Sequence, residues 1–206
     1  MCGAALVPPA AATAAADPQL AAHTVIAMTT GLLFMAPLGL AAAAAVRVGT
    51  QLGAQNPPGA RLSVAVGLGL AGILTAANVS FILAVRGSWA HLFTAAPAVV
   101  ALVTRWIVLL VPYSAFDALQ GVAVGSLRGI GRNGLAAASN CFSFFCFGLP
   151  IGWLLAIHAG WGLAGVWVGL TAAVASSSLL ALAALRWAVD WEREAASAHT
   201  RALQTH

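Results

Sequence analysis

The sequence WIVLLVPYSAFDALQGVAVGSL occupies residues 106 to 127, and its only charged residue is Asp117. Arg105 precedes it and Arg128 follows it. Because a helix rises about 1.5 Å per residue, Asp117 lies roughly 16 to 18 Å from either arginine, near the midplane of a hydrocarbon core roughly 30 Å thick. A carboxylate at that depth costs about 2.5 to 3.5 kcal/mol and is tolerated mainly where it faces protein or a wet cavity. Asp117 is therefore the first candidate functional residue.

The composition places the whole chain in the membrane class. Hydrophobic residues make up 61% of it and charged residues 7%, whereas soluble proteins average about 25% charged residues. The 206 residues leave room for about five spans of roughly 20 residues or more each. We therefore expect an all-α integral membrane protein that forms a single helical bundle, and we exclude a soluble globular protein.

The spacing of the charges locates the spans. Long charge-free stretches lie between Asp17 and Arg47, between Arg61 and Arg86, and between Arg132 and Arg186. The last of these is long enough for two helices, broken at the glycine-rich stretch 158–162. The predicted helices cover residues 22–46, 62–85, 99–127, 134–157 and 163–187 of the bundle 22–187. Residues 1–21 are a low-complexity start that we expect to be truncated, and 188–206 form a cytoplasmic tail.

Orientation follows from arginine, because the chain has no lysine. Most arginines fall on one side if the loop between residues 47 and 61 is cytoplasmic, as the excess of positive charge in cytoplasmic loops requires. Trp187 and Trp191 then lie near the inner boundary, as interfacial anchors. The net charge of +4 thus reflects membrane orientation, and no clustered basic face of the kind that binds nucleic acid is present.

Polar residues share the helix face of Asp117. Tyr113 and Ser114 precede it by four and three residues, and Gln120 and Gly121 follow it by three and four. This stripe indicates a polar surface that faces a cavity. The alternative is a structural acid that Tyr113 and a neighbouring helix satisfy.

Prolines and glycines predict local bends and close helix packing. Pro37, Pro112 and Pro150 lie inside expected spans, where each removes a backbone donor and bends the helix. The spacing of Gly121, Gly125 and Gly129 by four residues favours close approach of another helix, as do the pairs Gly148 with Gly152 and Gly165 with Gly169. The cysteines have no paired spacing and no histidine partners, so we expect no metal site.

Several segments, taken in order, resemble the carboxyl-terminal half of a multidrug and toxic compound extrusion (MATE) transporter of the eukaryotic type. They are LAAHTVI from Leu20, LLFMAPLGLAAAAAVRVGTQLGAQNP from Leu32, FDALQGVAVGSLRGIGR from Phe116, Asn140 with GLPIG at 148–152, GLAGVWVGL from Gly162 and DWEREA from Asp190. The resemblance implies helices eight to twelve of a twelve-helix fold.

The resemblance also implies a mechanism. Such proteins exchange a small organic cation or drug for protons or sodium by rocking two six-helix lobes, and they need no cofactor beyond the coupling ion. Asp117 stands at the position of the family's acid in helix ten, where it is expected to bind the coupling proton or the cationic substrate alternately. The family's glutamate on helix seven has no counterpart here.

Three further residues are expected to line the cavity together with Tyr113 and Gln120. Phe144 and Phe145 stand where relatives often carry tyrosines, which would make that wall less polar while keeping aromatic faces for a cation. Asn140 could face the same cavity or form a hydrogen bond between helices, and the sequence leaves both open.

The resemblance covers one lobe, so we expect a missing amino-terminal lobe or a partner subunit to complete any pathway. The protein is expected to be multi-pass, surrounded by membrane lipid, in the plasma membrane or a vacuolar or other organellar membrane. The alternative function is that of a non-transporting assembly partner or an inactive fragment. An enzyme is disfavoured, because Ser126 lies in VGSLRG, which lacks the GxSG pattern of an intramembrane serine nucleophile.

Overall fold

The computed structural model describes residues 17 to 204, with side chains up to residue 198, and every regular element in this part of the chain is helical. Five stretches of helix are long and apolar enough to cross a membrane. The predicted all-α class and the number of spans are confirmed. The observed spans are Pro18–Gly53, Pro57–Val85, Pro97–Ile130, Asn133–His158 and Leu163–Ala188.

The first two spans are helices α2 (Pro18–Gly53) and α3 (Pro57–Val85). Asp17 caps α2 by accepting a hydrogen bond from the Gln19 amide at 2.9 Å, and Asn56 caps α3 by accepting one from the Gly59 amide at 3.1 Å. With 36 residues, α2 is roughly 54 Å long and projects beyond a hydrocarbon core of roughly 30 Å. It therefore extends past both ends of the expected helix 22–46.

The third span consists of two helices joined by a tighter turn. Helix α4 (Pro97–Trp106) passes through a 3₁₀ turn at Ile107–Leu109 into α5 (Leu110–Ile130). Gly131, with φ of 93°, ends α5 in the left-handed conformation that glycine adopts without strain. Asp117 lies in the interior of α5.

The last two spans contain π-helical turns. Helix α6 (Asn133–Ser143) continues through a π turn at 144–148 into α7 (Leu149–Trp153), which ends in a second π turn at 154–158. Helix α8 (Leu163–Ala183) ends in a π turn at 184–188. The observed span ends differ from the expected ends by at most a few residues at 62–85, 134–157 and 163–187.

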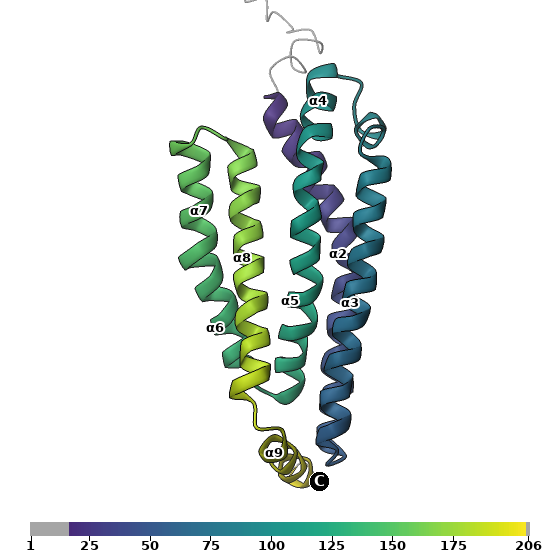
Figure 1. Cartoon of the computed structure of the whole chain (residues 1–206), viewed down its shortest axis with the longest axis vertical. Helices are drawn as coiled ribbons and strands as arrows, with labels where there is room; N and C mark the ends of the chain where they lie inside the picture. The colour runs from purple at the N-terminus through teal and green to yellow at the C-terminus, as the bar shows by residue number, and fades with distance from the viewer. Residues whose placement is uncertain (1–16, 205–206) are drawn as a thin grey trace, which may run out of the picture.

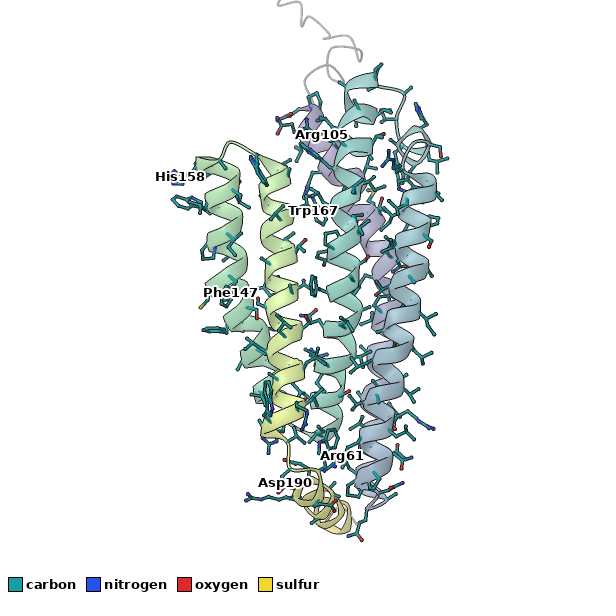
Figure 2. All side chains as sticks on the ribbon, in the orientation of Figure 1. Arg61, Arg105, Phe147, His158, Trp167 and Asp190 are labelled. Atoms are coloured by element: carbon teal, nitrogen blue, oxygen red, sulfur yellow. The ribbon has the colours of Figure 1, made fainter. Side chains whose placement is uncertain are left out.

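Helix α5 is the centre of the bundle, because it packs against α2, α3 and α8. Figure 1 shows α8 beside α5, with α6 and α7 forming the outer edge beyond α8. Charged and polar side chains lie at the two ends of the bundle, as the arginine pattern predicts. Arg105 and His158 lie toward one end, and Arg61 and Asp190 lie toward the other (Figure 2).

Closely spaced glycines bring the helices together. A methyl group on Gly125 or Gly129 would clash with the backbone of Ala41 or Ala45 in α2. One on Gly165 or Gly169 would clash with backbone of α7 and of the π turns on either side of it. The prediction that these glycines form packing faces is confirmed.

The tail forms helix α9 (Trp191–Gln204), which lies across the arginine-rich end of the bundle (Figure 1). This segment was expected as a cytoplasmic tail, and one side of α9 packs against the bundle, where Trp191 is 8% exposed and Ala195 is buried. Arg132 and Glu194 form an ion pair at 2.7 Å that ties α9 to the turn after α5. Trp187, by contrast, is 80% exposed, as an interfacial anchor would be. The expected low-complexity segment 1–21 lies largely outside the described residues.

Candidate cation-binding site

Asp117 is buried inside the bundle and lies between two cavities. Its side chain is 6% exposed, and it lines a small cavity toward α3 and a larger one toward α6. No hydrogen bond or ion pair to its carboxylate is found among the described residues. A buried carboxylate without such partners is costly, so its surroundings must either hold water or a cation or keep the acid protonated.

The small cavity measures about 10 Å³, close to the smallest volume that holds one water molecule. Helices α2, α3 and α5 enclose it. Asn78 of α3 lines it together with Thr30, Tyr113, Ser114 and Asp117. The Asn78 side-chain nitrogen is buried and has no hydrogen-bond partner within the described part of the chain. An unused donor and a carboxylate thus border one small polar space.

Tyr113 is held by an aromatic contact. Its ring meets Trp167 of α8 edge to face, with the centroids 6.0 Å apart. The Ser114 hydroxyl donates to the carbonyl of Val111 at 3.1 Å. In the described part of the chain, neither hydroxyl donates to Asp117, so the alternative in which Tyr113 satisfies the acid has no hydrogen bond to support it.

The larger cavity has a volume of about 170 Å³ and extends from Asp117 toward Arg128. Helix α2 contributes Pro37 and its neighbours, α5 contributes Gln120 and Gly121, and α6 contributes Asn140. The structure therefore brings the predicted residues Gln120 and Asn140 together with Asp117. The space is large enough to hold several water molecules.

A polar network joins three helices next to this cavity. Gln120 donates from its side-chain nitrogen to the Asn140 side-chain oxygen at 3.0 Å and to the Ser177 hydroxyl oxygen at 3.1 Å. Ser177 in turn donates to the same Asn140 oxygen at 2.5 Å. Asn140 thus lines the larger cavity and also accepts hydrogen bonds from two other helices.

Two prolines coincide with departures from α-helical geometry. The 3₁₀ turn at Ile107–Leu109 lies just before Pro112, and the π turn at 144–148 lies just before Pro150. Both turns include the residue four positions before the proline, whose carbonyl loses its usual donor. Pro37 lies within α2 without a break and lines the larger cavity. Helix bending at the three prolines stays a prediction.

Phe144 and Phe145 are not brought to Asp117 in the described part of the chain. Neither lines the two cavities beside the acid, and Phe145 is 68% exposed on the outer helix pair. Their role as cavity-lining residues stays a prediction. No group of three or more metal-ligating side chains occurs among the residues that the structure describes.

Sequence reasoning missed Asn78 and Ser177. Each has a signal in hindsight: Asn78 is an amide in the apolar span 62–85, and Ser177 lies in the middle of a run of three serines in the last span. Polar residues at membrane depth are candidates by the same argument that selected Asp117. The partner helices, however, are visible only in the fold.

The fold and the buried acid define an integral membrane protein with a candidate cation site. A family model described as MatE matches residues 12–154. Multidrug and toxin extrusion protein 2 of Mus musculus is 34% identical over 89% of this chain and 32% of its own length. Protein DETOXIFICATION 51 of Arabidopsis thaliana is 33% identical over 88% of this chain and 34% of its own.

The solved structures agree with the sequence comparisons. The crystal structure of the eukaryotic MATE transporter AtDTX14 superposes with a TM-score of 0.85 and 29% identity, covering 89% of this chain and 41% of that one. The chain belongs to the MatE family and is a multi-pass integral membrane protein. It spans about a third of the length of these curated relatives.

Proposed function

We propose that this chain forms the carboxyl-terminal lobe of a transporter that extrudes organic cations or drugs in exchange for protons or sodium. Asp117 is the residue that binds the coupling ion or the substrate cation. The observation behind the proposal is a single carboxylate in the middle of the bundle, 6% exposed and bordered by two cavities.

The chemistry of a carboxylate suits such an exchange. An ionised acid in a poorly solvated site attracts a cation strongly, because little water competes for the charge. When the acid takes up a proton or a sodium ion, that attraction is lost and the organic cation is released. The same group can therefore hold one cation at a time, which is the requirement for antiport.

The surrounding polar groups would position the ion. Asn78 offers an unused donor across the small cavity, which suits a water molecule that bridges to Asp117. Gln120 and Asn140 line the larger cavity, and hydrogen bonds fix them to each other and to Ser177 of α8. No cofactor and no enzymatic step are part of the proposal.

The size of the larger cavity indicates that a second lobe takes part. Its volume of about 170 Å³ is below the range of about 300 to 1,000 Å³ that is usual for sites of drug-sized ligands. A substrate would therefore be enclosed between this lobe and a partner, which is either the amino-terminal lobe or another subunit. The five spans correspond to helices eight to twelve in this proposal, in a plasma or organellar membrane.

The test is efflux of a fluorescent organic cation from proteoliposomes. The chain alone is compared with the chain joined to the amino-terminal portion of a full-length relative, each as wild type and as Asp117→Asn. Asp190→Asn, which removes an exposed carboxylate at the end of the bundle, is the matched control. Proton and sodium gradients are imposed separately.

Efflux from the joined protein that disappears in Asp117→Asn and persists in Asp190→Asn would support the proposal, and the gradient that drives it identifies the coupling ion. Efflux that is indifferent to Asp117→Asn would exclude the acid as the coupling residue. A joined protein that folds but transports nothing would favour a non-transporting assembly partner of the same family.

A further inference from the structure

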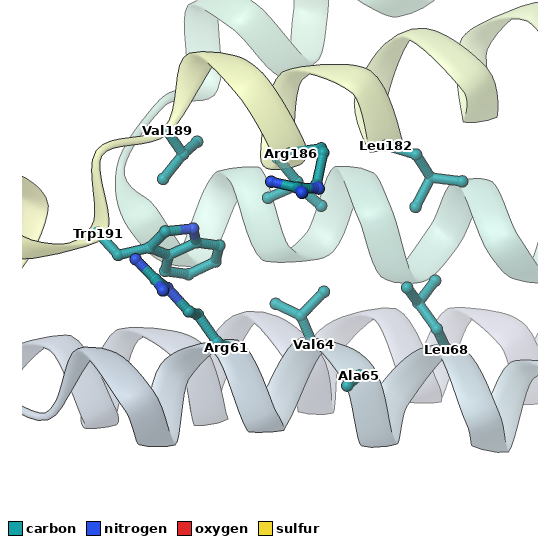
Figure 3. A pocket seen from close by; sticks show the side chains of 9 residues that line it. Arg61, Val64, Ala65, Leu68, Leu182, Arg186, Val189 and Trp191 are labelled. Atoms are coloured by element: carbon teal, nitrogen blue, oxygen red, sulfur yellow. The ribbon is translucent and has the colours of Figure 1, made fainter.

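A third cavity, which is remote from Asp117 and is called the arginine cavity below, lies between α3 and the end of α8. Its volume is about 510 Å³, and Arg61 and Arg186 approach it from opposite helices (Figure 3). Apolar side chains form its walls, among them Val64 and Leu182, and Trp191 closes it on the side of the tail helix. It therefore combines two guanidinium groups with an apolar interior.

The charge of this cavity is unbalanced. Among the described residues, the two arginines are the only charged ones that line it, and both are exposed. The ion pair found in the described part of the chain uses other residues, Arg132 and Glu194. Each guanidinium group is a planar fork of N–H donors that suits phosphate oxygens, and two of them line one space.

An apolar groove continues from the cavity along the outer face of α8. It measures about 500 Å³, shares Leu182 and Arg186 with the arginine cavity, and is lined by residues of α8 and the π turn that ends it, among them Leu179 and Trp187. Leu179 is 63% exposed and Trp187 is 80% exposed. From Arg186 back to Leu179 the helix rises roughly 10 Å toward the membrane interior. The charge of Arg186 thus lies toward one end of an apolar groove.

We propose that this site binds an anionic phospholipid, with its phosphate between Arg61 and Arg186 and an acyl chain along the groove of α8. A free inorganic anion would use the arginines and leave the groove empty. The site lies at the arginine-rich end of the bundle, where a basic pocket between membrane helices would meet the anionic lipids of the cytoplasmic leaflet.

The lipid would also connect the tail to the bundle. Trp191 and Val189 line the same cavity, and α9 is held nearby by the ion pair of Arg132 and Glu194. Arg186 itself belongs to the π turn at 184–188, a local geometry that often occurs at functional sites. The binding site is independent of the transport proposal, because its readout is lipid affinity.

The experiment is a lipid titration of the purified chain in neutral detergent, read by native mass spectrometry. Dioleoyl phosphatidylglycerol is compared with dioleoyl phosphatidylcholine, which has the same acyl chains. The site variant is Arg61→Gln with Arg186→Gln. The charge-matched control is Arg47→Gln with Arg193→Gln, at the same end of the bundle but outside the cavity.

We expect phosphatidylglycerol to bind about tenfold or more tightly than phosphatidylcholine, because the two arginines attract its anionic headgroup. The site variant should lose this preference and the control should keep it. Ala65→Trp, which narrows the cavity while retaining both arginines, should also weaken binding, so the result does not depend on charge removal alone. Circular dichroism checks that each variant folds.

Three outcomes would overturn the proposal. Equal affinity for the two lipids would remove the headgroup selectivity. Equal loss of the phosphatidylglycerol preference in the site variant and in the control would show that the preference comes from general surface charge. Displacement of phosphatidylglycerol by glycerol phosphate or inorganic phosphate at similar concentration would show an anion site that does not use the groove.

Discussion

The contact between α2 and α5 is a place where one added methyl group should have a large effect. A Cβ atom on Gly125 would lie 3.1 Å from the carbonyl carbon and 3.2 Å from the Cα of Ala41, and closer still to the carbonyl oxygen. Carbon atoms pack best at about 3.5 to 4.0 Å. Because the obstacle is backbone, the clash in Gly125→Ala can be relieved only if the two helices move apart.

The magnitude follows from two opposing effects. Overpacking of a tight interface costs about 1 to 3 kcal/mol, whereas alanine in place of glycine in a helix gains up to about 1 kcal/mol. We therefore expect Gly125→Ala to lower the free energy of unfolding by about 1 to 2 kcal/mol. The matched control is Gly69→Ala in α3, where a methyl group would have no neighbour within 4 Å, so no loss is expected.

The assay is reversible unfolding of the purified protein in mixed micelles with increasing dodecyl sulfate, followed by far-ultraviolet circular dichroism. Both variants are measured against the wild type under identical conditions. If Gly125→Ala were as stable as Gly69→Ala, the two helices would not approach each other as closely as described. The way in which α2 encloses the cavities beside Asp117 would then need another explanation.

Three further predictions concern the polar contacts. Ser177→Ala should lower the free energy of unfolding by about 0.6 kcal/mol, which is the typical contribution of a hydrogen bond between membrane helices. Ser176→Ala should not lower it, because the bonds found for that hydroxyl in the described part of the chain go to carbonyls of its own helix. The dodecyl sulfate assay distinguishes the two variants, and equal effects would contradict the network. Asn78→Leu should leave stability unchanged or raise it by about 1 kcal/mol, because a buried unsatisfied donor disappears, yet should impair efflux by the joined protein; normal efflux would exclude Asn78 from the site. Arg132→Gln should cost at most about 1 kcal/mol, since the ion pair is partly exposed, but should speed amide exchange in α9, and unchanged exchange would show that the pair does not hold the tail.

The sequence was sufficient for the membrane class, the five spans and the burial of Asp117. The first two follow from the composition and the spacing of the charges, and the third follows from the depth of one charge in an apolar run. It also predicted the packing faces of Gly125 and Gly129, since spacing by four places residues on one side of a helix. Helix ends were less predictable. Helix α2 runs from Pro18 to Gly53, past the charged residue that was used to mark its end, because an arginine near the interface does not stop a helix.

The parts that could not be predicted depend on which helices become neighbours. Asn78 and Ser177 carry little information by themselves, and only the packing of α3 and α8 against α5 places them beside Asp117 or Gln120. The burial of Trp191 is of the same kind. An interfacial tryptophan and a tryptophan packed under the bundle have the same sequence context. Only the fold decides between them, because it places Trp191 around one cavity with Arg61 and Val64.

The most direct test of the central claim is equilibrium binding of a fluorescent organic cation to the chain joined to the amino-terminal portion of a relative. The comparison is between the wild type, Asp117→Asn and the control Asp190→Asn. We predict that Asp117→Asn weakens binding about tenfold or more, because a bond to a charged group contributes about 1.5 to 3 kcal/mol, while Asp190→Asn binds normally. Equal affinity in all three proteins would contradict the assignment of Asp117 as the cation-binding residue.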